Sequence, residues 1–422
     1  MHGSSSGDLR SPAPRSHSSE SNLRILEVET FGRGGLIHYA HNLSRALAER
    51  GHEVTLVTTA AYELEGQDLP PNVQVRKVIG RWAPGKGKGG RGQGWPAVLG
   101  SLARKVEAVT DALRVAVLAR RLRPDVVHLH CTNPASLVYH LFFRLLGQPL
   151  VATAHVVTPH EGIRWQGTIY GWIHRSCHLV VAHSEFDRQR LITEFRLEAE
   201  RTVVIPHGEY GFFAGGLAES PGTVSDREAS RQSFGLEEED EVALFFGYLR
   251  EYKGLDILFE AWEIVLRERP SARLLVAGDP VNLPESRREE LRAWADRLGV
   301  VHRFGYVPFS EVERYFRAAD MLVMPYRHIS QSGVLYLALA LGVPVVATRV
   351  GALPEVLQDG EDALLVPPEN PQELARALGR AFEDPALRRR LAEGGQRVAE
   401  EHSWPAIARR TESAFARIPR RH

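Results

Sequence analysis

Cysteine is scarce in this chain of 422 residues, which holds only Cys131 and Cys177. Two thiols build neither a disulfide framework nor a zinc site of four thiolates. Long apolar runs are missing too, because no stretch reaches the ~18–20 residues that a membrane-spanning helix needs. The first residues are rich in Ser, Gly and Pro and lack the apolar core of a signal peptide. We therefore expect a cytoplasmic protein.

Net charge is also absent, since 52 Lys and Arg residues balance 52 Asp and Glu residues. The chain as a whole therefore has no electrostatic attraction for nucleic acid, and we expect no nucleic-acid partner. Chelating patterns such as H-E-x-x-H do not occur in the sequence. We accordingly expect no metal site and no other cofactor.

Short apolar runs alternate with helical or turn patterns along most of the chain. Leu150-Val151-Ala152-Thr153 and Leu274-Leu275-Val276-Ala277 are two of them, and such runs are typical of parallel sheets covered on both faces. The alternation of strands and helices predicts an α/β protein. Because a single core stops growing near ~250–300 residues, we expect two α/β domains.

Changes in composition predict where these domains begin and end. The first residues offer almost nothing to bury, and a stretch rich in Gly, Pro and Lys interrupts the first domain. We assign residues 1–21 to a disordered tail and 22–206 to an N-terminal domain with a mobile basic loop at about 60–97. We assign residues 207–400 to the C-terminal domain and 401–422 to a C-terminal helix. The pattern does not decide whether this helix crosses back to the N-terminal domain.

Glycines follow the first strand, at the edge where open α/β sheets bind ligands. The block Gly32-Arg33-Gly34-Gly35 opens a helix, so it is either a tight turn or an anion site made of backbone amides. NAD is not the expected ligand. The spacing does not fit G-x-G-x-x-G, and the second strand ends in Thr58-Thr59 without an acid.

Two cations follow the first strand of the second domain. Arg250 and Lys253 lie between Gly247, which ends the strand, and Gly254, which opens a helix. Two positive charges beside a helix N-terminus suit a diphosphate. The alternative is a pair of solvated surface charges, and the flanking glycines favour the diphosphate.

Two further segments carry candidate groups at strand ends. Ser332 and Gly333 would offer a hydroxyl and a backbone amide at the start of another helix. His155 follows the strand Leu150–Thr153 and is either a hydrogen-bonded core residue or a functional group. Its position on the cleft-facing edge favours a function.

The order and spacing of these motifs across two domains resemble the GT-B glycosyltransferases, specifically the retaining family 4 enzymes (glycosyl transferases group 1). The resemblance covers about residues 23–417. It rests on Gly34-Gly35, Pro124-Asp125-Val126-Val127-His128, Thr153-Ala154-His155, His183-Ser184-Glu185, Ile205-Pro206-His207-Gly208, Lys253-Gly254-Leu255-Asp256, Ala277-Gly278-Asp279, Phe304-Gly305-Tyr306-Val307 and Gly342-Val343-Pro344-Val345-Val346.

The resemblance implies a GT-B fold, in which two Rossmann-like parallel-sheet domains face each other across a cleft. It also implies that a nucleotide sugar binds there, mostly to the second domain. Arg250 and Lys253 would hold the diphosphate, while His155 would face the transferred sugar and stabilise an oxocarbenium ion with its carbonyl. The other donor-binding positions would be Gly34, Gly35, Gly247, Tyr306, Val307, Gln331, Ser332, Gly333 and Val334, with Tyr306 and Val307 at the nucleobase.

One departure from the family pattern concerns two glutamates that many members carry eight positions apart. Ile329 and Leu337 occupy those positions here, and neither side chain binds a hydroxyl. A subset of the family carries Gln-Ser-Gly-Val instead, as residues 331–334 do, and we assign the chain to that subset.

The resemblance predicts a metal-independent, retaining glycosyltransferase that moves a sugar from a nucleotide diphosphate to an acceptor. The acceptor stays open between a glycan, a lipid-linked compound and a small molecule. The alternative, motivated by the missing glutamates, is a catalytically silent GT-B module that acts as partner subunit of an active transferase. A nucleotide-sugar epimerase or a phosphorylase ranks below both.

The basic loop leaves a second question open. Its cations and two tryptophans allow either a flexible solubilising loop or peripheral contact with the inner face of an anionic membrane. They are Arg81, Trp82, Lys86, Lys88, Arg91 and Trp95.

Overall fold

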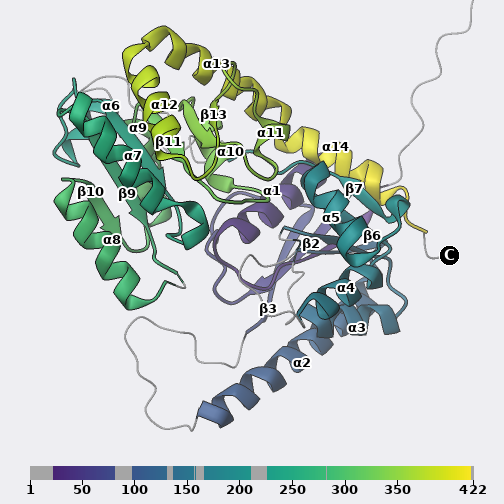
Figure 1. Cartoon of the computed structure of the whole chain (residues 1–422). Coiled ribbons are helices and arrows are strands. Elements are labelled where there is room, and N and C mark those ends of the chain that lie inside the picture. Colours follow the sequence, from purple (N-terminus) through teal and green to yellow (C-terminus); the bar gives the residue numbers. More distant parts are fainter. Residues whose placement is uncertain are drawn as a thin grey trace, which may run out of the picture.

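Two parallel β-sheets form the cores of two domains in the computed structural model, which describes residues 22–80, 97–130, 136–155, 157, 166–210, 226–281 and 283–419. The first sheet has the order β3-β2-β1-β4-β5-β6-β7, and the second has the order β10-β9-β8-β11-β12-β13. Helices cover the sheets, and the two domains face each other (Figure 1). The fold is therefore the expected pair of Rossmann-like domains.

The N-terminal strands are β1 (Arg24–Val28), β2 (Glu53–Thr59), β3 (Val73–Ile79), β4 (Val126–Leu129), β5 (Leu150–Thr153), β6 (Leu179–Ala182) and β7 (Thr202–Val204). The C-terminal strands are β8 (Val242–Phe246), β9 (Arg273–Gly278), β10 (Val301–Phe304), β11 (Met321–Met324), β12 (Val345–Thr348) and β13 (Leu364–Val366). The inner strands β4, β5, β6, β11 and β12 are buried at every position, which explains their unbroken apolar runs.

The helices of the first domain are α1 (Gly35–Glu49), α2 (Ala97–Leu122), α3 (Leu137–Leu145), α4 (Gln166–Ser176) and α5 (Glu185–Phe195). Those that follow are α6 (Asp226–Gln232), α7 (Leu255–Glu268), α8 (Glu285–Arg297), α9 (Phe309–Ala318), α10 (Gly333–Ala340), α11 (Leu353–Val356), α12 (Pro371–Glu383), α13 (Pro385–Glu401) and α14 (Trp404–Phe415).

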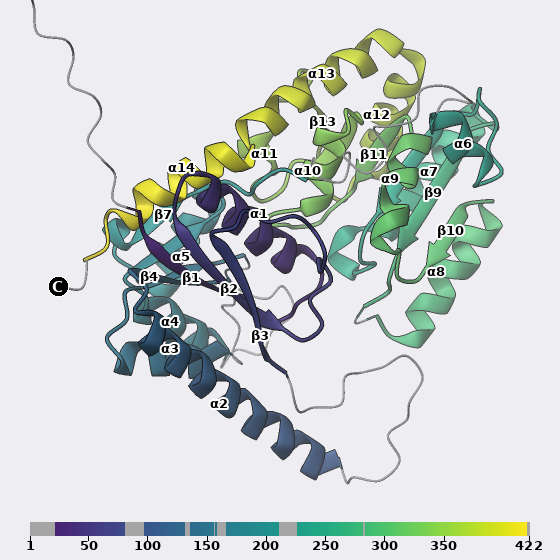
Figure 2. The same ribbon diagram turned by 180° about the vertical axis from the view of Figure 1, so that it is seen from behind.

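Helix α14 extends from the second domain back to the first, beside α1 (Figure 2). Trp404, Ile407 and Phe415 belong to the same hydrophobic cluster as Tyr39 and Leu43 of α1. The apolar face of the last helix thus completes the core of the N-terminal domain.

A carboxylate of the second domain holds the start of a helix in the first. The Glu355 oxygens accept hydrogen bonds from the amides of Glu185 and Phe186, both at 2.7 Å. These amides belong to the first turn of α5, where no intrahelical acceptor exists and where the helix dipole favours negative charge. The contact fixes the relative position of the domains on one side of the cleft.

The prediction of a long loop at about 60–97 is wrong for residues 73–79, because these residues form the edge strand β3. This strand pairs only with β2, and the exposed Gln74 and Arg76 interrupt its apolar residues. An edge strand with one wet face has no continuous apolar run, so its pattern resembles that of a loop. The tail 1–21 and the basic residues 81–91 lie outside the described residues, as do Trp82 and Trp95.

Within the described ranges, no helix combines the length and the apolar character that spanning a bilayer requires.

Candidate active site

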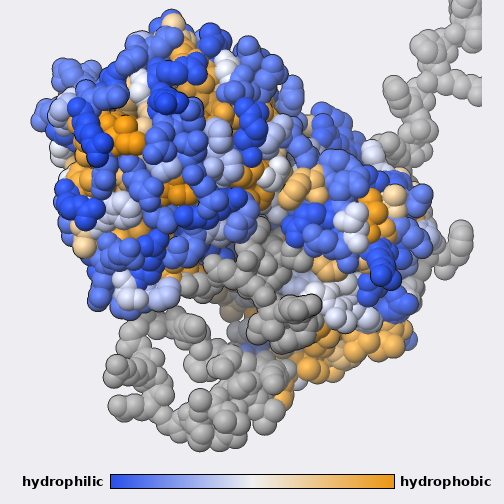
Figure 3. Space-filling view, in the orientation of Figure 1, coloured by the Kyte–Doolittle hydropathy of each residue, from blue (hydrophilic) through white to orange (hydrophobic). Residues whose placement is uncertain are grey.

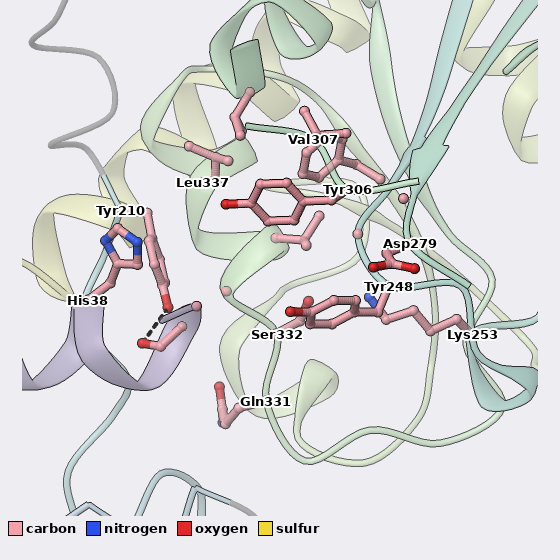
Figure 4. Close-up of a pocket in the computed structure, with 18 of the residues that line it drawn as sticks. His38, Tyr210, Tyr248, Lys253, Asp279, Tyr306, Val307, Gln331, Ser332 and Leu337 are labelled. Atoms are coloured by element: carbon pink, nitrogen blue, oxygen red, sulfur yellow. Dashed lines mark hydrogen bonds between the residues drawn. The ribbon is translucent and has the colours of Figure 1, made fainter. Parts of the chain in front are cut away.

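A cavity of about 330 Å³ opens between the N-terminus of α1 and the carboxyl ends of the second domain's strands. In the close-up, His38 and Tyr210 lie on one side, while Tyr248, Lys253 and Asp279 lie on the other (Figure 4). Ten of the residues singled out from the sequence line it, namely Gly34, Gly35, Gly247, Lys253, Tyr306, Val307, Gln331, Ser332, Gly333 and Val334.

Lys253 places a positive charge at the wall of this cavity. The residue is only 6% exposed, and its ammonium group lies 5.2 Å from the centroid of the Tyr326 ring. Among the described residues, no carboxylate forms an ion pair with it. Burial lowers the pKa of Lys253, and the charge of Arg250 lowers it further. A buried cation without a counter-ion is poised to bind an anion.

Two glycines make room for this lysine. A β-carbon at Gly247, whose φ is +105°, would lie 2.9 Å from the Lys253 Nζ atom. A β-carbon at Gly278 would lie 1.7 Å from the carbonyl oxygen of Gly247, which the backbone cannot accommodate. The ends of β8 and β9 therefore approach closely only because both positions are glycine.

Arg250 lies beside the cavity but is not among the residues that line it. Its guanidinium carbon lies 5.9 Å from the ring centroid of Tyr248, which does line the cavity. Its Nε atom is buried and finds no hydrogen-bond partner among the described residues. The structure thus brings Lys253 to the cavity wall and keeps Arg250 one side chain away.

The start of α10 forms the adjoining part of the wall, since a β-carbon at Gly247 would lie 3.1 Å from Val334 Cγ2. Ser332 precedes the helix, and the amides of its first turn have no intrahelical acceptor, so this end carries a partial positive charge. Gln331 also reaches the first domain, because its Nε2 donates to the carbonyl of His183 at 3.4 Å. Tyr210 lies between the domains, and a β-carbon at Gly333 would be 2.9 Å from its hydroxyl.

The glycine loop before α1 does not offer all of its amides to a ligand. The Gly34 amide donates to Glu63 Oε1 at 2.6 Å, and the Gly32 amide donates to Glu29 at 2.7 Å. Burial raises the pKa of Glu63, but hydrogen bonds from His38 and Gly34 outweigh it and lower the pKa overall. An ionised carboxylate therefore holds the Gly34 amide that the sequence offers to an anion.

Replacing Glu63 by Gln removes this negative charge and keeps an acceptor for Gly34. We expect the Kd for the nucleoside diphosphate that the family resemblance implies to fall about fivefold, since one fewer like charge is worth about 1 kcal/mol in a partly solvated site. Isothermal titration calorimetry measures the change. Glu65→Gln, which alters an exposed residue paired with Lys77, is the matched control. An unchanged or weaker affinity in Glu63→Gln would contradict this role.

Two exposed aromatic rings lie at the mouth of the cavity. Tyr306 is 56% exposed and Tyr248 is 47% exposed, which is unusual for large rings beside a concave site. Burial raises the pKa of Tyr306, and the charge of Glu63, which lines the same cavity from the first domain, raises it further. Flat rings at this place are suited to stacking on a nucleobase.

Ile329 and Leu337 also line the cavity. At these positions the cavity therefore has apolar walls where many family members would have carboxylates. Polar groups of the lining come instead from residues such as Gln331 and Ser332.

His155 belongs to a buried chain of hydrogen-bonded rings rather than to the lining. The Ile205 carbonyl accepts from His183 Nδ1 at 2.9 Å, so in the neutral ring Nε2 is left to accept from His155 Nδ1 at 3.0 Å. His155 Nε2 lies 3.5 Å from His130 Nδ1. Both ring nitrogens of His155 therefore face other histidines, and burial together with these neighbours keeps its pKa well below 6.5.

Glu27 ends this chain inside the N-terminal core. His130 Nε2 lies 2.5 Å, and His128 Nδ1 2.9 Å, from Glu27 Oε2. Burial alone would raise the pKa of Glu27, but the two histidines outweigh it and hold the pKa at about 2. The carboxylate is therefore ionised at neutral pH.

Two groups of side chains could each hold a metal ion, because within each group the ligand atoms lie within 4.8 Å of one another. The first group is His155, His183 and His207, and the second is Glu27, His128 and His130. In the second group Glu27 binds both histidines. In the first, the carbonyls of Ile205 and Gly208 accept from the Nδ1 atoms of His183 and His207. Contacts within the protein thus engage ligand atoms of both groups.

Sequence reasoning missed several lining residues. His38, Glu63 and Tyr210 are contributed by a helix face and by two loops without a recognisable motif. The contact between His38 Nε2 and Glu63 Oε1, at 3.0 Å, could have been suspected only if the loop after β2 were known to fold back over α1.

Comparison with known proteins decides the family. Residues 240–384 match the family described as glycosyl transferases group 1, and residues 33–208 match glycosyltransferase family 4. A D-inositol 3-phosphate glycosyltransferase of Acidothermus cellulolyticus is 30% identical over 403 residues, covering 90% of this chain and 85% of that protein. The chain belongs to the group 1 (family 4) glycosyltransferases.

This glycosyltransferase is similar to other members in sequence and in fold. A D-inositol 3-phosphate glycosyltransferase of Segniliparus rotundus is 28% identical over 395 residues, covering 90% of this chain and 83% of that protein. The Anabaena protein HepE in complex with UDP-glucose matches with a TM-score of 0.72 at 22% identity, over 94% of this chain and 100% of that one. The catalytic domain of Arabidopsis starch synthase IV, bound to ADP and acarbose, also matches with a TM-score of 0.72. The two are 15% identical, and the match covers 94% of this chain and 99% of that one. The GT-B fold is confirmed.

Proposed function

We propose that this glycosyltransferase transfers a sugar from a UDP-sugar to an acceptor hydroxyl with retention of the anomeric configuration. The observation that carries the proposal is Lys253, a buried cation without a described counter-ion, on the wall of a cavity that the N-terminus of α10 also lines. UDP as the carrier is supported by the similarity to HepE, which was solved with UDP-glucose.

The reaction develops negative charge on the leaving diphosphate. The bond between the sugar C1 and the diphosphate oxygen breaks, and C1 forms a new bond to the acceptor oxygen on the same face. The acceptor proton passes to the departing diphosphate. Lys253 and the amides of Gly333 and Val334 stabilise this charge, and preorganised groups of this kind are typically worth about 2.7–4 kcal/mol each.

The remaining residues position the donor. Tyr306 and Tyr248 stack against the nucleobase, and Gln331 binds sugar hydroxyls in place of the family glutamates. Arg250, which lies behind Tyr248, adds to the positive potential without direct contact. The family resemblance assigns the backbone carbonyl of His155 to the sugar, while its ring remains in the histidine chain. Because these groups neutralise the diphosphate, we propose that catalysis needs no metal.

Release of UDP from UDP-glucose in the presence of candidate acceptors tests this function. D-inositol 3-phosphate is the first acceptor to try, since it is named for relatives at 28–30% identity. We expect acceptor-dependent UDP release, an α-linked product by NMR and a rate unchanged by EDTA. A β-linked product would contradict retention. Tight UDP binding without turnover on any acceptor would instead support the silent module.

A further inference from the structure

Helix α2 exposes an apolar stripe on the outside of the N-terminal domain. Val106, Val109, Leu113 and Val117 are 43–56% exposed and recur every three or four residues, so they share one face of the helix. Leu141 and Leu145 of the neighbouring α3 are also exposed, the latter at 72%. We call these six residues the α2–α3 face. An apolar area lies over α3 and the end of α2 in Figure 3.

This face is not the side by which α2 packs on its own domain. Ala112, Val115, Ala116 and Ala119 are buried in or against the core on the other side of the helix. A surface helix normally presents polar residues opposite its buried face. Contiguous exposed apolar patches of this kind mark interaction sites.

Unpaired arginines border the α2–α3 face. Arg120, Arg121 and Arg123 at the end of α2, and Arg144 at the end of α3, are exposed. No carboxylate of the described residues forms an ion pair with them. Two acids of the same segment pair with other residues, Asp111 with Arg114 and Asp125 with Arg24. Four exposed arginines therefore gather at one end of the face although the chain as a whole is neutral.

We propose that the α2–α3 face docks on an anionic lipid surface. The leucines and valines enter the boundary between headgroups and acyl chains, as an amphipathic helix does when it lies in the interface. The four arginines bind lipid phosphates, and each cation near such a surface strengthens binding about fivefold. A second copy docked by the same face would place its own four arginines against these. The proposal does not depend on the proposed reaction.

Co-sedimentation of the full chain with vesicles tests the docking. We expect binding to vesicles of phosphatidylglycerol and phosphatidylcholine, and little binding to phosphatidylcholine alone. Arg120→Ala/Arg121→Ala should weaken the partition about 25-fold, and Val109→Ser/Leu113→Ser about tenfold. These positions are exposed, so folding is unaffected, and circular dichroism verifies it. UDP binding should stay unchanged in both double variants.

Matched controls alter residues of the same kind on other surfaces. Arg389→Ala/Arg409→Ala removes two exposed arginines of α13 and α14, and Phe186→Ser removes an exposed apolar side chain of α5. Both should bind vesicles like the parent protein. If the test variants and the control variants lose vesicle binding to the same extent, the proposal is overturned. The absence of vesicle binding would also overturn it, including the case in which light scattering shows a dimer that Val109→Ser/Leu113→Ser dissociates.

Discussion

Lys253→Ala is expected to lower kcat/KM about 10²–10³-fold, which is the effect of removing one preorganised donor to a developing oxyanion. The loss should fall on both UDP affinity and turnover, because in the proposed mechanism Lys253 contacts the diphosphate before and after the bond breaks. UDP release and calorimetric titration measure the two effects. The comparison variant is Arg250→Ala, which removes a cation that does not line the cavity. Its kcat/KM should fall less than tenfold. A change under about threefold in Lys253→Ala would refute its role.

The same lysine gives UDP binding a pH dependence. Because burial and Arg250 lower the pKa of Lys253, the free enzyme loses this charge at a lower pH than an ordinary lysine does. Bound diphosphate favours the charged form and raises the pKa again. UDP affinity is therefore highest below the pKa of the free enzyme and falls as the pH rises through it, with proton uptake on binding. Lys253→Ala should abolish that uptake.

Glu27→Gln is expected to lower the free energy of unfolding by about 3 kcal/mol at pH 7. This magnitude is typical of removing one partner from a buried charge pair, and its direction agrees with the lowered pKa of Glu27. Since the folded-state pKa is the lower one, the stabilisation is complete above pH 4.5 and is lost as the pH falls towards 2. Urea denaturation at several pH values measures it.

An exposed acid on the neighbouring strand provides the control for this prediction. Glu53→Gln on β2 should change the free energy of unfolding by less than about 0.5 kcal/mol. If Glu27→Gln is as stable as the parent protein at pH 7, Glu27 does not anchor the histidine chain. Activity should fall as well, because His130 and His155 lose the group that orders them.

The parts of the fold that could be read from the sequence are those that are buried on both faces. Residues 150–153 and 345–347 are unbroken apolar runs because sheet neighbours and helices cover them. Strand β3 was missed because one of its faces is exposed to solvent, so polar residues interrupt its apolar ones. The start of α10 was found since Ser332 and Gly333 follow a strand end, where parallel sheets bind ligands.

Site residues could be predicted where a local sequence motif fixes the position of the side chain. They could not be predicted where contacts between distant segments fix it. Lys253 reaches the cavity because Gly247 and Gly278 leave space for it, and all three lie in motifs. The ring of His155 is held by His130 and His183, which come from other strands, so no local pattern reveals its direction. Glu63 likewise reaches Gly34 over a separation of 29 residues.

A crystal structure of the enzyme with UDP tests the central claim most directly. The account predicts the diphosphate in the interdomain cavity, with Lys253 Nζ and the amides of Gly333 and Val334 within hydrogen-bond distance of its oxygens and the uracil against Tyr306. A diphosphate bound elsewhere, or bound in this cavity with Lys253 turned away from it, would contradict the account.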